Sequence, residues 1–130
     1  MIEVTILTEM TWIIDSQHWP RAYLRAELIE RGFDAVGFMD PQQALTALNR
    51  PSYAKPRLIV LEFFELEADR PEIAAVASLG IPTIVLGGAV QMNEQWIRGF
   101  EWADVVQRPF TVGEVADRVE RLIKDTEYSG

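Results

Sequence analysis

The sequence predicts an α/β fold in which strands and helices alternate along the chain. Short apolar runs rich in β-branched residues alternate with segments whose apolar residues recur at helical spacing. One run, residues 58–61, is continuously apolar, as expected for a strand of a sheet that is covered on both faces. Gly32, Gly80 and Gly87 stand where such segments end. We therefore expect five β-α pairs that form one mostly parallel, doubly wound sheet with helices on both faces.

The composition points to a single domain, residues 1–130. Of 130 residues, 48% are hydrophobic and 25% charged, which is typical of a soluble globular protein. Cysteine is absent and there is one histidine, which excludes disulfides and a two-histidine zinc site. The net charge of −8 argues against direct binding of a nucleic acid. No apolar run is long enough to span a membrane and the N-terminus lacks a basic start, so we expect a cytoplasmic protein.

The first half of the chain is expected to contain two strands and two helices. Residues 2–7 form an apolar, β-branched run typical of a strand. A helix should open near Pro20, because proline suits a first helical turn, and should stop at Gly32. Residues 33–38 are predicted to form the second strand. Asp40 can cap the next helix, with a glutamine three residues later as its capping partner.

The second half continues the alternation. In order, the predicted elements are a strand at 58–61, a helix at 72–79, a strand at 81–86, a helix at 93–100, a strand at 103–106 and a final helix from Thr111. That last helix has the most regular apolar stripe, and a glutamate three residues after Thr111 is its capping partner. Because ligands of such sheets bind at the carboxyl ends of the strands, functional residues are expected there.

Several segments resemble the receiver domain of two-component response regulators. Residues 56–62, PRLIVLE, stand where that family has Pro-Asp-Leu-Ile-Leu-Leu-Asp, and residues 108–110, RPF, stand where it has Lys-Pro-Phe. Residues 1–9 resemble the family's opening, which ends in two aspartates. The resemblance covers nearly the whole chain and implies a flavodoxin-like (βα)5 sheet with strand order 2-1-3-4-5. It also implies a signalling module that is not an enzyme and needs no resident cofactor.

The acidic positions of the family's phosphorylation site differ in this chain. The nucleophilic aspartate that closes the third strand corresponds to Glu62. The two acids that hold Mg²⁺ correspond to Thr8 and Glu9, so one carboxylate is missing. We therefore expect no metal site, apart from weak Mg²⁺ binding by Glu9 and Glu62.

The remaining site positions also differ. The family's Thr or Ser after the fourth strand corresponds to Gly87, which has no hydroxyl, and its lysine corresponds to Arg108, followed by Pro109. The aromatic residue that switches in the fifth strand corresponds to Val105. Together these changes favour a degenerate receiver that does not run the normal phosphoryl cycle.

Glu62 and Arg108 suggest what replaces that cycle. A glutamate carries a permanent negative charge about one bond further out than an aspartate, and arginine can bind a carboxylate through two hydrogen bonds. A Glu62–Arg108 pair would stand in for the metal and phosphoryl group and lock the domain in one state. On this hypothesis Glu62→Gln destabilises the site and weakens partner binding.

The first strand has two registers. We prefer residues 2–7, which leaves residues 10–19 as an apolar insertion that could cap the old phosphorylation pocket or lengthen the first helix. The alternative makes residues 12–16 the first strand, with Asp15 as its acid and residues 2–7 as an N-terminal extra. In both registers Trp12 and Trp19 are expected to pack in the core.

Aromatic residues near the fourth helix suggest a contact surface. The resemblance implies that the face of helix four, strand five and helix five binds a protein partner or a second copy of the chain. Trp96, Phe100, Trp102 and Val105 belong to that region, and exposed aromatics are enriched in interfaces. The alternative is that some of the three rings are core.

Two other functions compete with a pseudo-receiver that acts by protein contacts. One is a regulator that accepts a phosphoryl group at an unusual site. The other is a flavodoxin-like small-ligand binder, in which Gly87 lets a ligand approach the backbone, although the chain has no G-x-G-x-x-G or Walker motif.

Overall fold

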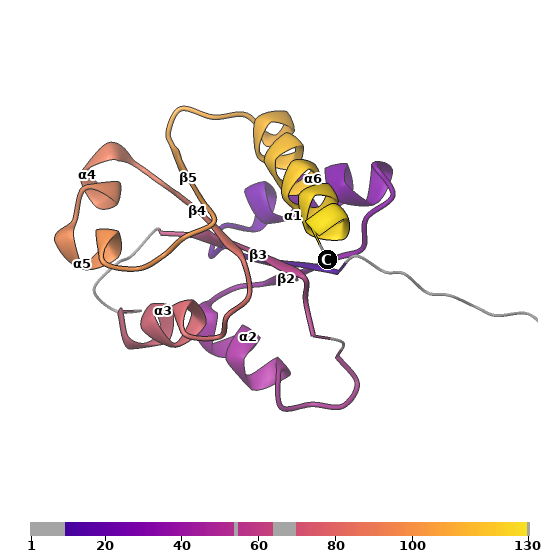
Figure 1. Ribbon diagram of the computed structural model, residues 1–130, viewed down its shortest axis with the longest axis horizontal. Coiled ribbons are helices and arrows are strands. Elements are labelled where there is room, and N and C mark those ends of the chain that lie inside the picture. The colour runs from indigo at the N-terminus through magenta and orange to yellow at the C-terminus, as the bar shows by residue number, and fades with distance from the viewer. Residues whose placement is uncertain (1–9, 54, 64–69, 130) are drawn as a thin grey trace, which may run out of the picture.

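One sheet of five parallel strands, in the order β2-β1-β3-β4-β5, organises the molecule (Figure 1). The computed structural model describes residues 10–53, 55–63 and 70–129. The strands are β1 (Thr11–Ile14), β2 (Ala35–Phe38), β3 (Leu58–Glu62), β4 (Thr83–Gly87) and β5 (Asp104–Gln107). The predicted fold class and strand order are confirmed.

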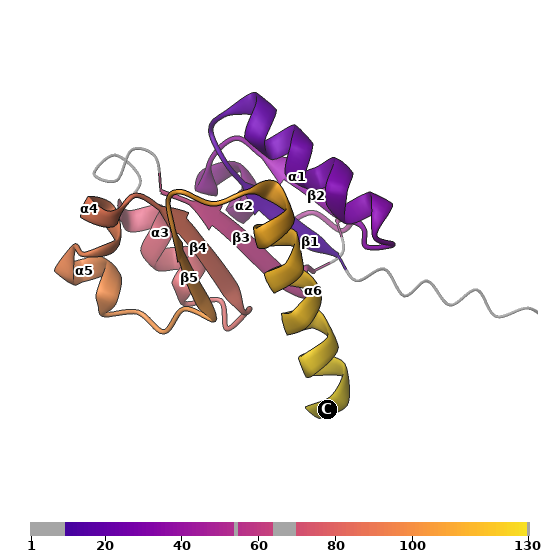
Figure 2. The same cartoon turned by 90° about the horizontal axis from the view of Figure 1, so that it is seen from above.

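Helices cover both faces of the sheet. They are α1 (His18–Glu30), α2 (Pro41–Ala47), α3 (Arg70–Ala77), α4 (Ala89–Met92), α5 (Gln95–Arg98) and α6 (Val112–Ser129). The helices α1 and α6 lie side by side on one face, while α2 and α3 lie on the other (Figures 1 and 2). Among the described residues, no helix combines the length and the apolar character needed to cross a membrane.

Each central strand contributes to two cores, because successive side chains point to opposite faces. In β1, Trp12 and Ile14 pack on the side of α2 and α3, whereas Ile13 packs on the side of α1 and α6. All four residues of β1 are buried. Three of these residues are apolar, as expected for a strand covered on both faces, and Thr11 is a buried polar exception. The core packing expected of Trp12 is thus confirmed, whereas that expected of Trp19 is wrong, because Trp19 is 63% exposed.

The preferred register of the first strand is wrong, and the alternative is confirmed. Thr11–Ile14 lies between β2 and β3, with Thr11 paired to Ala35 on one side and to Leu58 on the other. Asp15 is therefore the acid that follows β1. Residues 2–7, together with Thr8 and Glu9, lie outside the described residues.

The expected helix at 93–100 is also wrong, because two short helices occupy that region. The first, α4, ends at Met92, and the Asn93 side chain donates a hydrogen bond to the Ala89 carbonyl oxygen at 2.8 Å. Glu94 then has an extended backbone, with ψ of 132°, before α5 begins. A side chain that bonds the backbone of the preceding turn favours a helix end over its continuation.

The predicted caps of α2 and α6 are confirmed. The Gln43 backbone N–H donates to Asp40 Oδ1 at 2.8 Å, and the Gln43 side chain accepts from the Met39 N–H. The Glu114 N–H donates to Thr111 Oγ1 at 3.1 Å. These bonds satisfy N–H groups that have no partner within the first helical turn.

Candidate functional site

The residues at the carboxyl ends of β1, β3, β4 and β5, which we call the apex residues, lie at one edge of the sheet. Asp15 follows β1, Glu62 is the last residue of β3, Gly87 is the last of β4 and Arg108 follows β5. The Arg108 backbone N–H donates to the Gly87 carbonyl oxygen at 2.9 Å, which continues the β4–β5 ladder and fixes the start of the Arg108 side chain. Parallel strands thus place an acid from β3 and a base after β5 at one edge.

Glu62 and Arg108 form the ion pair that the sequence predicted. Arg108 Nη2 donates to Glu62 Oε1 at 2.8 Å. The two partners differ in exposure, since the Glu62 side chain is 3% exposed and the Arg108 side chain 43%. The Arg108 guanidinium also lies over the Phe110 ring, 5.4 Å from its centroid. The peptide bond between Arg108 and Pro109 is cis. A buried carboxylate is therefore covered from outside by a half-exposed guanidinium.

Burial makes Glu62 a weaker acid in spite of its partner. The pKa of Glu62 is raised to about 7, mainly by desolvation. The hydrogen bond and the charge of Arg108 lower the pKa, but only partly offset the desolvation, and the nearby Asp15 also raises it. Burial thus opposes the permanent negative charge that was expected at this position, because a pKa of about 7 leaves part of the carboxyl protonated near neutral pH. The contact with Arg108 remains possible in both forms, since a protonated carboxyl keeps an acceptor oxygen.

Asp15 is the second acid of the apex. It is 6% exposed, and Asp15 Oδ1 accepts from the Gln17 backbone N–H at 2.9 Å. Burial raises the pKa of Asp15, although Gln17, Arg21 and Arg108 act in the opposite direction. Arg21 Nη1 donates to the Asp15 carbonyl oxygen at 2.7 Å, and its side chain crosses Gly37, where a Cβ would lie 2.9 Å from Arg21 Cδ.

Gly87 gives the space of a side chain to Met92. A Cβ added to Gly87 would lie 2.7 Å from Met92 Cε, so the thioether of α4 fills the position that a Thr or Ser side chain would need. Gly87 has no positive φ. The glycine is therefore explained by the close approach of Met92 and not by a strained turn.

The described residues offer two carboxyl groups, Asp15 and Glu62, near the place of the Mg²⁺ ion that the resemblance implies. Mg²⁺ needs a near-octahedral shell of oxygen ligands. Within the described ranges, no group of three or more His, Cys, Asp or Glu side chains could hold a metal ion. Glu62 is engaged by a guanidinium, and the weak Mg²⁺ site expected at Glu9 and Glu62 involves a residue outside the described ones.

A cavity of about 290 Å³ lies directly beside the ion pair, between α1 and α6. Its apolar walls come from both helices and from β1, β3 and β4. It is lined by Ile13, Ile14, Asp15, Gln17, Pro20, Tyr23, Leu24, Val60, Glu62, Leu86, Arg108, Phe110, Val112 and Val115. Both apex acids and Arg108 thus line one cavity, which is partly open to solvent.

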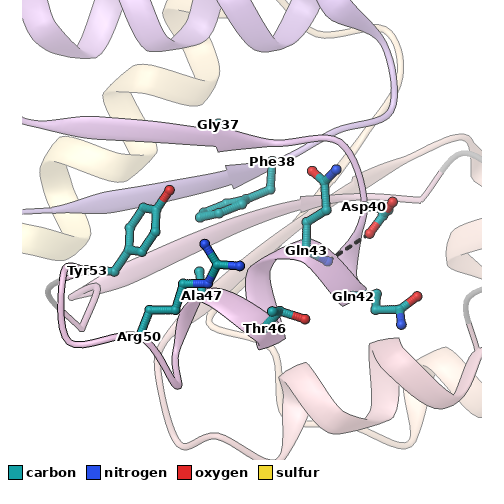
Figure 3. Close-up of a pocket in the computed structure, with 9 residues that line it drawn as sticks. All are labelled: Gly37, Phe38, Asp40, Gln42, Gln43, Thr46, Ala47, Arg50 and Tyr53. Atoms are coloured by element: carbon teal, nitrogen blue, oxygen red, sulfur yellow. Dashed lines mark hydrogen bonds between the residues drawn. The ribbon is translucent and has the colours of Figure 1, made fainter.

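A second hollow, of about 460 Å³, lies between β2, the edge strand of the sheet, and α2 (Figure 3). Figure 3 shows Tyr53 and Arg50 on one side of Phe38 and Gln43 with Asp40 on the other. Its lining contains none of the apex residues, so it is separate from the ion pair.

The aromatic residues that suggested an interface pack largely on one another. The Trp102 ring lies 5.9 Å from that of Phe63 and 5.4 Å from that of Phe100, and Trp96 lies 6.3 Å from Phe63. Trp102 Nε1 donates to the Ile97 carbonyl oxygen at 2.9 Å. The three rings are half-buried, whereas Val105 of β5 is 44% exposed and Val90 of α4 is 80% exposed.

Comparison with solved structures identifies the fold as that of receiver domains. The receiver domain of the Francisella response regulator 1452 has a TM-score of 0.74 and 20% identity, covering 92% of this chain and 99% of that one. A response regulator receiver protein from Pseudomonas putida has a TM-score of 0.74 and 18% identity, covering 90% and 99%.

A third similar structure comes from a family of redox sensors in the streptococci that evolved from two-component response regulators. It has a TM-score of 0.73 and 13% identity, and covers 92% of this chain and 53% of that one. The sequence itself matches no family model and no curated protein. The resemblance seen in the sequence is thus confirmed at the level of the fold.

Proposed function

We propose that this chain is a receiver-like module of two-component-type signalling that acts through protein contacts without accepting a phosphoryl group. One observation carries the proposal: the residue at the phosphoacceptor position, Glu62, is 3% exposed and bonded to Arg108. The receiver fold supports the signalling role. One similar fold belongs to redox sensors that evolved from response regulators, which supports a departure from the usual chemistry.

The chemistry of phosphoryl acceptance explains why this site is unsuited to it. A carboxylate must be ionised, accessible and free to attack, and a metal ion must neutralise the phosphoryl oxygens. The pKa of Glu62, raised by burial to about 7, leaves part of the carboxyl protonated at neutral pH. Arg108 occupies one of its oxygens, and Met92 stands where a side chain at position 87 would bond the phosphoryl group.

Partner binding is proposed for the surface made by α4, β5 and α6. Val90 and Val105 are exposed apolar residues there, and a contact that covers them would remove apolar surface from water. The half-buried rings of Trp96, Phe100 and Trp102 lie in and after α5, between α4 and β5 in the chain. The partner is a protein or a second copy of this chain.

The absence of phosphoryl transfer is tested by mass measurement. The protein is incubated with acetyl phosphate and Mg²⁺, beside a receiver domain that is known to accept phosphoryl groups, and the intact mass of each is followed with time. The proposal predicts that only the control gains about 80 Da. A gain in this chain that is lost in Glu62→Gln would instead establish a phospho-accepting regulator.

A further inference from the structure

The cavity beside the ion pair has two chemically different ends. Ile13, Val60 and Leu86 of the sheet supply an apolar floor, and these three are almost completely buried. At the apex, Asp15 and Glu62 add two carboxyl groups to the lining. An apolar cavity with a few converging polar groups is the usual form of a small-molecule site.

The charges around the cavity favour a cationic ligand. Two buried carboxyl groups and one guanidinium, that of the 43% exposed Arg108, line the cavity. A second guanidinium, that of Arg21, lies outside the lining and bonds the Asp15 carbonyl oxygen. The Tyr23 ring of α1 stands in the wall, and ring faces attract cations, as the Phe110 ring already does for Arg108. The chain carries a net charge of −8, which further favours a cation over an anion.

We propose that this cavity binds a small organic amine, whose apolar body lies between α1 and α6 and whose ammonium group contacts Asp15 and Glu62. The volume of about 290 Å³ suits a ligand with one ring or a short chain. An ammonium group satisfies both carboxylates at once and removes the repulsion between them. A carboxylic acid would meet Asp15 and Glu62 with its own negative charge.

The regulatory consequence rests on the proposed function. An ammonium group on Glu62 competes with Arg108, and the half-exposed guanidinium can turn toward solvent. The ligand would then open the contact that holds the ends of β3 and β5 together. A receiver-like module would in this way respond to a small molecule in place of a phosphoryl group.

Three matched probes test the inference. Phenethylamine, 2-phenylethanol and 3-phenylpropanoate share an aromatic body and differ in the charge of the head group. We expect phenethylamine to bind about 10- to 100-fold more tightly than the alcohol, because its head group makes charge-assisted hydrogen bonds, and the acid to bind least. Binding is measured by titration with NMR detection, which also shows whether the shifted signals belong to the cavity.

Variants locate the site. Glu62→Gln and Asp15→Asn should each weaken phenethylamine binding about tenfold, and Tyr23→Ala should weaken all probes that bind. Asp40→Asn and Tyr53→Ala, which change the same residue types in the separate hollow of Figure 3, should leave binding unchanged. Phenethylamine binding should also strengthen from pH 6 to pH 8, because Glu62 ionises over this range. The other charged groups near the two carboxyl groups are Arg21 and Arg108.

The inference is overturned if phenethylamine does not bind, or if it binds no better than the alcohol. It is also overturned if the shifted signals lie outside the cavity. Because the readout is binding of an unphosphorylated protein, this result is separate from the mass measurement. A protein that binds the amine and also gains a phosphoryl group would keep the inference and reject the proposed function.

Discussion

At the scale of single residues, the apex shows that an ion pair can be predicted when its energetics cannot. Glu62 closes a strand and Arg108 follows the strand two places away in the sheet, so their types and positions were enough to predict the contact. The state of the carboxyl depends on how many apolar atoms surround it. The sequence does not state that number, and so the raised pKa of Glu62 was missed.

The raised pKa reverses the expected effect of Glu62→Gln on stability. A carboxyl whose pKa is 4.5 in the unfolded chain and about 7 in the folded one stabilises the fold below pH 4.5 and loses this contribution as the pH rises to 7. Glutamine keeps the acceptor oxygen without the charge. We therefore expect the free energy of unfolding of Glu62→Gln to exceed that of the wild type by about 1–3 kcal/mol at pH 8 and by clearly less at pH 5.

Urea unfolding at pH 5 and pH 8 measures this difference. The free energy of unfolding of the variant should still fall as the pH rises, because burial also raises the pKa of Asp15. Asp40→Asn is a suitable control, because asparagine also caps a helix. A variant that is clearly less stable than the wild type at pH 8 would restore the original expectation.

Gly87 offers a second test at this scale. A serine there would return a hydroxyl to the apex but must displace the end of the Met92 side chain, which is flexible. We expect Gly87→Ser to cost about 1 kcal/mol, and Gly87→Ser with Met92→Ala to recover part of the cost contributed by the clash. Thermal unfolding of the single and double variants measures the coupling, and independent effects would show that Met92 does not restrict position 87.

At the scale of elements, the first strand shows where sequence reasoning failed and which signal was present. Residues 2–7 alternate apolar residues with Glu3 and Thr5, which is the pattern of a strand exposed on one face. Thr11–Ile14 lies at the centre of the sheet and is buried throughout. The same argument that identified β3 from its continuous apolar run would have chosen β1. The break between α4 and α5 had a weaker signal, the asparagine at position 93.

In the region of α5 and β5, Trp102 is expected to contribute to stability and Val105 is not. Trp102→Ala removes a half-buried ring from Phe63 and Phe100 and a hydrogen bond to Ile97, so we expect a loss of about 2–3 kcal/mol. Val105→Asp changes an exposed residue and should alter stability by less than about 0.5 kcal/mol. Chemical denaturation of both variants measures this, and equal losses would show that Val105 is part of the packing.

Val105→Asp also tests the proposed interface. If the surface of α4, β5 and α6 binds a partner or a second copy, the variant should lose that binding while remaining folded. Sedimentation at several concentrations, or binding to the partner once it is known, gives the readout. Met39→Asp, at an exposed apolar residue that follows the edge strand β2, is a matched control away from this surface, and the prediction fails if both variants behave alike.

At the scale of the whole molecule, the chain has the receiver fold, and the proposal is that it does not use the phosphoryl cycle. The sheet order, the two-sided covering by helices and the apex at the strand ends all follow from the alternation of strands and helices. The site departs from the family at the places where Arg108, Met92 and the buried Glu62 close it. The fold was therefore predictable from pattern, whereas the cavity required the packing of α1 against α6.

The contact between Glu62 and Arg108 is the centre of this account, and an NMR titration of the Glu62 side-chain carboxyl carbon tests it most directly. The account predicts a pKa of about 7 in the wild type and a higher pKa in Arg108→Ala, because the guanidinium lowers it. A pKa near the ordinary 4.5 that does not change when Arg108 is removed would contradict it.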